Sequence, residues 1–366
     1  MNGRQRGVPK FGLLYAILLP VLVVPVAVLL WLAVRGNEAE QYYQKGLEAV
    51  LAGDSAAAID CFRQAGSQGH AEACCNLGLI YLYGSGCDPD PELAHDYLEL
   101  GALYGSVQAE YELGNLAEQS AKGADYALAA LHYNRAALAG HPDAMLALAR
   151  LYETGCGVNQ SYVLAESFYR RAMAAGNMEA QCALAELYWS GPPEIANGAE
   201  AFRLFSLAAE AEFPRGYSGL GCLYEHGWDL HAPDPERARQ YYRIAAALGD
   251  SAAMVNLGDL LMAEKPEEAL QLYHQAAKLN FAPAWHRLGL RFFNGADGAP
   301  PDYAAAKQCF EQAARGGNAS SWINLGIMYE LGYGTAVNPA MAEKCYRQAR
   351  EMGHAEAEKR LRELRK

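Results

Sequence analysis

A small residue recurs within apolar helical segments at intervals of 31 to 37 positions, and this repeat constrains the fold more than any other feature. This helix-A marker is found at Gly46, Gly78, Gly114, Ala149, Ala185, Gly221, Gly258, Gly289 and Gly326. A second small residue, the helix-B marker, stands three positions after an aromatic residue or leucine, at Ala65, Gly101, Ala136, Ala172, Ala208, Ala245, Ala276, Ala313 and Ala349. Self-similarity with a period of about 20–50 residues is typical of repeat proteins. The two markers therefore predict nine hairpins, each made of a helix A and a helix B.

Glycine within a helix needs a reason, because it costs about 1 kcal/mol relative to alanine. We expect helices A and B of one hairpin to approach closely at the helix-A marker. The helix-B marker is predicted to form the other half of that contact.

Six residues after the helix-A marker, a glycine often returns, and we expect it to end helix A in the left-handed conformation. These glycines are Gly84, Gly155, Gly191, Gly227, Gly295 and Gly332. Ser120 and Glu264 occupy the position in two repeats, and Pro192 and Pro193 follow Gly191, so irregular loops are expected there.

Two kinds of motif resemble the SEL-one-like repeat family, a tetratricopeptide-like family. The segments 81–86 (YLYGSG) and 152–158 (YETGCGV) resemble its loop signature, and 69–73 (GHAEA), which recurs at 353–357, resembles its repeat junction. The resemblance implies an all-α, right-handed α-solenoid of about nine helix-turn-helix repeats over residues 38–353. A capping helix is expected over residues 354–366, where Leu361 and Leu364 give a single apolar stripe.

Residues 11–34 contain no charged side chain and are mostly apolar. As a helix they would extend about 36 Å, enough to cross a hydrocarbon core of about 30 Å. A cleavable signal peptide is the competing interpretation, but its apolar region is usually about 7–15 residues long and ends in a small-residue cleavage site. The sequence therefore favours an uncleaved transmembrane signal anchor.

Basic residues precede this segment in residues 1–10, which contain no acidic side chain. The positive-inside rule predicts that this tail is cytoplasmic and that the solenoid lies across the membrane. In a bacterium, the protein would be a single-pass inner-membrane protein with its solenoid in the periplasm.

Beyond residue 35 the chain has 26 basic and 42 acidic side chains. This acidity argues against nucleic acid as a partner, because phosphates require clustered Lys and Arg. A protein partner with a basic binding surface is favoured instead.

The histidines do not indicate a metal or catalytic site. His70, His141 and His354 occupy the same repeat junction, so a structural role is predicted for them. His226 and His231 flank one loop, where a solvated pair is favoured over a metal site.

Catalytic motifs are also missing from the sequence. The segment 216–220 (GYSGL) comes near to a nucleophile elbow, but its fifth residue is Leu and it opens a helix A. The nine cysteines contain no C-x-x-C pair and are expected to be mostly buried, reduced fillers, with pairing of Cys74 or Cys75 left open in an oxidising compartment. We predict no catalytic, cofactor-binding or metal-binding residues and no cofactor.

The likeness to tetratricopeptide repeats implies that helix A lines a binding groove, with side chains at fixed offsets from its marker. The predicted partner-binding residues are Tyr111, Glu118, Arg150, Glu153, Glu186, Trp189, Glu225, Asp259, Phe293 and Glu330. Six carboxylates against one Arg, interspersed with aromatic rings, favour a basic protein segment with apolar anchors. Binding through an edge or the loops is the alternative.

These features predict a membrane-anchored, non-enzymatic protein-binding solenoid. The family resemblance implies an immunity protein that neutralises a periplasm-acting antibacterial effector, such as a type VI secreted phospholipase. A scaffold or regulator of envelope or exopolysaccharide assembly is the alternative, and an enzyme is the least favoured class.

Overall fold

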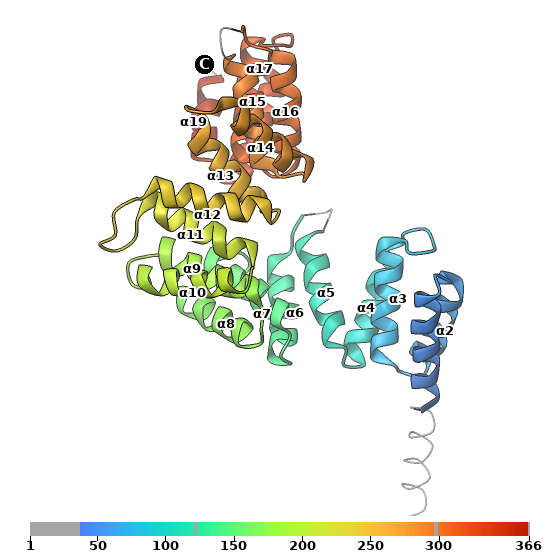
Figure 1. Ribbon diagram of the computed structural model, residues 1–366. Helices are drawn as coiled ribbons and strands as arrows, with labels where there is room; N and C mark the ends of the chain where they lie inside the picture. The colour runs from blue at the N-terminus through green and yellow to red at the C-terminus, as the bar shows by residue number, and fades with distance from the viewer. Residues whose placement is uncertain (1–36, 121–122, 296–298, 365–366) are drawn as a thin grey trace, which may run out of the picture. The chain divides into compact units, whose positions relative to one another are not determined.

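The computed structural model describes residues 37–120, 123–295 and 299–364 (Figure 1). Within these ranges, the named elements are all helices, and an isolated antiparallel bridge joins Trp228 and His231. The chain divides into two compact units, one ending at Asn177 and the other beginning at Met178.

The first unit contains four hairpins. Residues 37–51 are helical and form helix A of the first hairpin. The remaining helices are α2 (Ser55–Ser67), α3 (Ala71–Tyr83), α4 (Pro91–Leu103), α5 (Val107–Glu118), α6 (Tyr126–Leu138), α7 (Pro142–Thr154) and α8 (Tyr162–Ala174).

The second unit contains five hairpins and a final single helix. Its helices are α9 (Met178–Ser190), α10 (Gly198–Glu210), α11 (Pro214–His226), α12 (Pro235–Ala247), α13 (Ser251–Leu261), α14 (Pro266–Lys278), α15 (Ala282–Asn294), α16 (Tyr303–Arg315), α17 (Ala319–Leu331), α18 (Pro339–Glu351) and α19 (Ala355–Leu364). The predicted all-α array of nine helix pairs is confirmed. The last helix, α19, packs Ala357 and Leu361 against the cluster that holds Tyr346 and Ala349.

The predicted cytoplasmic tail (residues 1–10) and membrane span (residues 11–34) lie outside the described residues. None of the helices in the described ranges combines the length and apolar composition needed to span a membrane.

Each glycine at the helix-A marker lies against one large side chain of helix B in its own hairpin. A Cβ atom on Gly221 would lie 2.5 Å from the Cδ1 and Cε1 atoms of Tyr242, and one on Gly114 would lie equally close to Tyr133. Carbon atoms normally pack about 3.5–4.0 Å apart. The close approach predicted from the recurring glycines is therefore confirmed.

The predicted partner of that contact was wrong, because the helix-B marker does not face the glycine. The large residue three positions earlier fills the contact, and the marker packs elsewhere. A Cβ atom on the marker Gly101 would lie 3.1 Å from Ala109 Cβ on the next helix A and 3.2 Å from the Ala71 carbonyl on its own. The helix-B marker is small because it lies between the A helices of two successive hairpins.

The glycines that follow helix A confirm the expected left-handed conformation in only part of the set. Gly84, Gly155 and Gly332 are left-handed C-caps. Gly227 and Gly295 have positive φ but ψ near 170° (167° and 170°), a region essentially reserved for glycine. Gly191 has no positive φ, so the prediction was wrong there. In that loop a Cβ atom would instead lie 2.2 Å from the Leu187 carbonyl.

Candidate protein-binding face

Most of the acidic residues predicted to line the groove accept a hydrogen bond from a buried tyrosine of helix B. The hydroxyl groups of Tyr133, Tyr169, Tyr242, Tyr273 and Tyr346 donate to Glu118 (2.8 Å), Glu153 (2.5 Å), Glu225 (2.6 Å), Asp259 (2.6 Å) and Glu330 (2.6 Å), respectively. Burial, followed by the neighbouring carboxylate or thiol, raises the pKa of four of these phenols, those of Tyr133, Tyr242, Tyr273 and Tyr346. Each carboxylate thus satisfies a polar group of the hairpin core.

The sequence contains a signal for this pairing that composition alone missed. In all five hairpins whose helix B carries the buried tyrosine, an acidic residue stands one or four positions after the helix-A marker. The other four hairpins have Phe or Leu instead of the tyrosine, and the residue four positions after their marker is apolar: Val50, Leu82, Trp189 or Phe293. One of these four, the hairpin of Phe205, still has an acid one position after its marker, Glu186, which pairs with Arg215. Five of the six predicted groove acids are thereby explained by the phenol that donates to each of them.

Two further arginines reduce the negative charge of the face in the second unit. Arg215 on α11 donates to both carboxylate oxygens of Glu186 on α9, at 2.9 and 2.6 Å, and it also pairs with Glu179. Arg287 makes the same bidentate contact with Asp259, at 2.8 and 2.6 Å. The Arg215 side chain is only 29% exposed. The sequence prediction of six carboxylates against one arginine missed both pairs, because neither arginine was among the predicted groove residues.

Two of the predicted residues, Glu186 and Trp189, meet in a hollow of about 490 Å³ on the A-helix side of the second unit. Its other lining residues come mainly from α11 and α13: Ser190, Phe205, Arg215, Ser218, Gly219, Cys222, Asp250, Ala252 and Asn256. A volume of this size is within the range of ligand pockets, about 300–1,000 Å³. Three successive A helices thus share one concave site with an aromatic wall and several polar groups.

The remaining predicted residues lie outside this hollow. In the first unit, the Tyr111 ring stacks on His141 with centroids 4.6 Å apart, and Arg150 on α7 is exposed. In the second unit, Phe293 packs edge-on against Tyr303 (5.4 Å) and Tyr333 (5.5 Å). Phe293 is therefore part of the hairpin packing.

The junction histidines have the predicted structural role. The Nδ1 atoms of His70 and His141 accept hydrogen bonds from the third backbone N–H of the helix that each begins, at 3.2 Å. Their Nε2 atoms contact Glu40 (3.1 Å) and Gln108 (3.0 Å) of the preceding helix A. Each ring therefore links two successive hairpins.

The loop histidines His226 and His231 are both exposed, as the sequence predicted for a solvated pair. Each also lies against a tryptophan, His226 against Trp189 and His231 stacked on Trp228, with centroids 5.6 and 4.5 Å apart. All nine cysteines are free, and burial raises the pKa of Cys75 and Cys182 to about 12. Across the described residues, no group of three His, Cys, Asp or Glu side chains is arranged to hold a metal ion.

Comparison with known proteins identifies the repeat and the fold. The Sel1 repeat profile matches residues 32–70, 71–105, 107–141, 142–177, 179–213, 214–250, 251–281, 282–318 and 323–354. An uncharacterised protein of Neisseria meningitidis serogroup B is 29% identical over 274 residues, which cover 75% of this chain and 50% of that protein. The chain thus spans half the length of this curated relative.

One solved structure with a TM-score above 0.5 shows the same architecture. The structure of c5321, a protective antigen of uropathogenic Escherichia coli displaying an SLR fold, aligns with a TM-score of 0.55 and 23% identity, covering 91% of this chain and 72% of that one. The immunity protein Pa5087 of Pseudomonas aeruginosa aligns with a TM-score of 0.44 and 20% identity, covering 57% and 81% of the two chains.

Proposed function

This chain belongs to the Sel1 repeat family, and from that premise we propose that it is a non-enzymatic solenoid that binds a partner protein on its A helices. The observation that carries the proposal is the hollow beside Trp189, which three successive A helices build together. Buried aromatic anchors in such concave sites supply most of the binding energy of protein interfaces.

The partner is proposed to insert a basic side chain into this hollow. Arg215 is already paired with two carboxylates, those of Glu179 and Glu186, so two negative charges lie beside one positive charge here. Asp250 adds a further carboxylate to the lining. The face of Trp189 can hold an arginine or lysine through a cation–π contact, which contributes about 0.5–2 kcal/mol.

The test is co-purification of the full-length chain with its cross-linked partner from envelope extracts, followed by binding measurements on two matched variants. Asn256→Lys places a positive charge inside the hollow, and Gln271→Lys places the same charge on the exposed surface of α14. We expect at least a tenfold loss of affinity, about 1.4 kcal/mol, for the first variant and less than twofold for the second. Equal affinities, or turnover of a lipid or glycan by the purified chain, would refute the proposal.

The finer form of the proposal places the solenoid in the bacterial periplasm, anchored through residues 11–34. The 24 uncharged residues of that segment and the basic side chains before it support this placement. A carboxy-terminal tag should be degraded by protease added to spheroplasts and protected in intact cells. Protection in spheroplasts would contradict the periplasmic location.

Within that location, we propose that the chain is an immunity protein that captures a periplasm-acting effector, such as a type VI secreted phospholipase. Excess acidic charge suits rapid capture of a basic protein. Deletion of the gene should sensitise cells to siblings that deliver the effector, and re-expression should restore resistance. Loss of exopolysaccharide or envelope integrity without such sensitivity would favour the alternative role as an assembly scaffold.

A further inference from the structure

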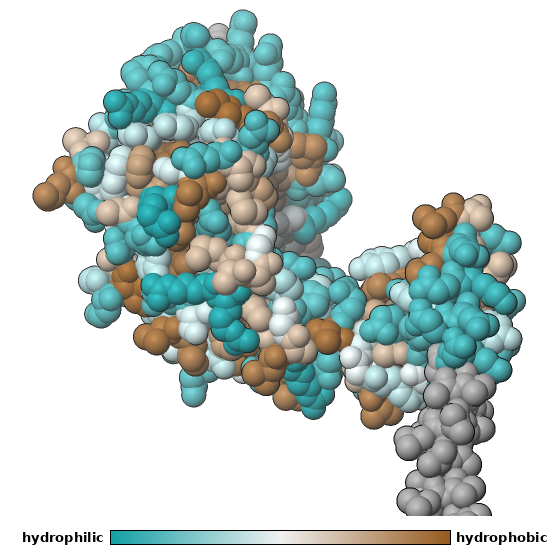
Figure 2. All heavy atoms as spheres, turned by 60° about the horizontal axis from the view of Figure 1, so that its bottom comes forward, coloured by the Kyte–Doolittle hydropathy of each residue, from teal (hydrophilic) through white to brown (hydrophobic). Residues whose placement is uncertain are grey.

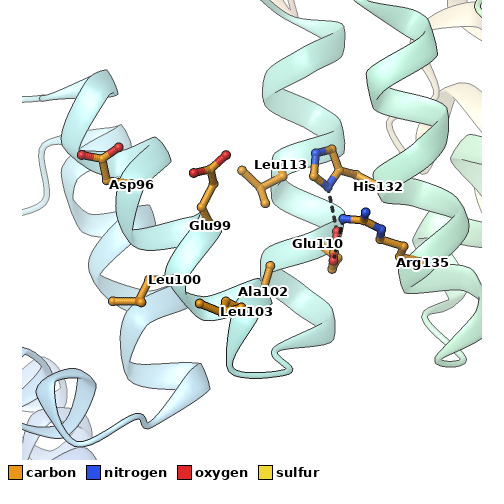
Figure 3. A pocket seen from close by; sticks show the side chains of 9 residues that line it. All are labelled: Asp96, Glu99, Leu100, Ala102, Leu103, Glu110, Leu113, His132 and Arg135. Atoms are coloured by element: carbon orange, nitrogen blue, oxygen red, sulfur yellow. Dashed lines mark hydrogen bonds and ion pairs between the residues drawn. The ribbon is translucent and has the colours of Figure 1, made fainter.

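A second hollow, of about 700 Å³, lies in the first unit between two successive B helices, α4 and α6 (Figure 3). Asp96 and Glu99 lie on its α4 side, and His132 and Arg135 on its α6 side. Leu100, Leu103 and Leu113 supply apolar surface between them. Leu103 is 77% exposed, so a large aliphatic side chain is presented to solvent here.

Two other gaps between successive B helices are bridged by an arginine. Arg63 on α2 hydrogen-bonds Tyr97 on α4, and Arg243 on α12 pairs with Glu268 on α14 at 3.8 Å. Both arginines stand two positions before the helix-B marker. In α4 that position is occupied by the acid Glu99, which cannot form the bridge that Arg63 and Arg243 make.

On the α6 side of the hollow, an arginine that could reach the preceding B helix makes a different contact. Arg171 on α8 donates to the Ala137 carbonyl on the preceding B helix at 3.0 Å. Arg135 occupies the same register position in α6, but it turns to Glu110 on α5, at 3.4 Å. Glu110 also contacts His132 at 2.7 Å, so the basic side chains on the α6 side already have an acidic partner within the hollow.

The α4 side keeps uncompensated negative charge. Glu99 lies 3.8 Å from His95, and that pair is charged only when the imidazole is protonated. Asp96 is exposed one turn earlier on the same helix. An occupant of this hollow must therefore bring positive charge to α4 and an aliphatic surface to Leu103.

We propose that the hollow between α4 and α6 is a second docking surface, which takes an amphipathic helix of a partner protein with leucine-like anchors and a Lys or Arg opposite Asp96 and Glu99. A groove between two helices is filled by a third helix when its apolar stripe matches the walls. This surface is separate from the hollow beside Trp189, so it would allow the solenoid to bind a second segment.

The probe is a synthetic amphipathic helix of leucine and lysine, about 18 residues or five turns long, with a second peptide in which glutamate replaces every lysine. Fluorescence anisotropy measures binding to the full-length chain. We expect Asp96→Lys/Glu99→Lys to weaken the lysine peptide at least tenfold and to admit the glutamate peptide. Leu103→Gln, which changes no charge, should weaken the lysine peptide several-fold.

The matched control is Glu210→Lys/Glu267→Lys, which makes the same change in net charge at exposed positions of α10 and α14. It should alter binding less than twofold. Equal losses in both double variants, or no effect of Leu103→Gln, would overturn the proposal, because the attraction would then be non-specific. Conversion of a dimer to a monomer by Asp96→Lys/Glu99→Lys in sedimentation would also overturn it, since the occupant would be a second copy.

Discussion

Replacing Tyr346 by phenylalanine tests whether the recurring acidic residues stabilise the hairpins. The Tyr346 ring is fully buried, and its hydroxyl donates to Glu330 at 2.6 Å. Phenylalanine keeps the ring and removes only this donor. Three other hairpins carry phenylalanine at the same position, at Phe62, Phe205 and Phe310, so the fold accommodates the ring without its hydroxyl.

The expected loss follows from the strength of a hydrogen bond to a charged acceptor, about 1.5–3 kcal/mol in net stability. Glu330 is half-buried and can regain water when the donor is removed. The loss for Tyr346→Phe should therefore be about 1–2 kcal/mol. Glu330→Gln keeps a neutral acceptor and should cost about half as much. Glu330→Ala leaves the buried hydroxyl without an acceptor and should cost about 1–3 kcal/mol.

Tyr329→Phe is the matched control, because Tyr329 lies on α17 beside Glu330, is half-buried, and contacts Lys307 through its ring. Its expected effect is below about 0.5 kcal/mol, as for substitutions that break no buried contact. Urea unfolding of the full chain, with hydrogen exchange read over α17 and α18, measures the change hairpin by hairpin. The double variant Tyr346→Phe/Glu330→Ala should give a coupling energy of about 1–2 kcal/mol. If Tyr346→Phe and Tyr329→Phe agree within error, the bond does not explain the recurrence of the acid.

Gly221→Val should destabilise its hairpin by about 1–3 kcal/mol in urea unfolding, because its side chain would overlap the ring of Tyr242; the double variant with Tyr242→Ala should show coupling, and simple additivity would contradict the contact. Arg215→Met should cost about 1–3 kcal/mol and loosen α9 from α11 in hydrogen exchange, because it leaves Glu186 partly buried without its partner; unchanged exchange would refute the bridging role. Stability should also fall at alkaline pH, since burial raises the folded-state pKa of the helix-B tyrosines above the unfolded value of about 10. Their contribution is complete below pH 10 and is lost as the pH rises above it. Ionisation of all the tyrosines in one phase near pH 10, with no later phase that coincides with unfolding, would contradict this.

The sequence predicted correctly where one residue type had a single physical reason to recur. Glycine at the helix-A marker required close contact, and the structure confirms it at Gly114 and Gly221. The choice of contact partner failed, because a periodic pattern gives the spacing of two positions and not which of several neighbouring residues faces the glycine. The Tyr133 ring, and not the small residue Ala136 three positions later, fills that contact.

The contacts of surface side chains were harder to predict from the sequence, because exposed positions accept many residue types. Figure 2 shows hydrophobic residues in small groups among hydrophilic ones on the face in view, without one dominant apolar area. The residues Glu186 and Trp189 were predicted to be neighbours on one face, and they do share a hollow. Arg215 was missed there, because its pairing with Glu179 and Glu186 joins two helices about 30 positions apart.

The sequence by itself determined the repeat, the number of hairpins and the acidity of the chain, because these depend on periodicity and composition. Only the tertiary structure decided which charges are free. Five predicted groove acids accept hydrogen bonds from buried phenols. One of these, Asp259, and a further acid, Glu186, pair with arginines, whereas Glu99 on α4 stands where α2 and α12 have a bridging arginine. Charge available to a partner depends on what each side chain already contacts, and those contacts exist only once successive hairpins are packed together.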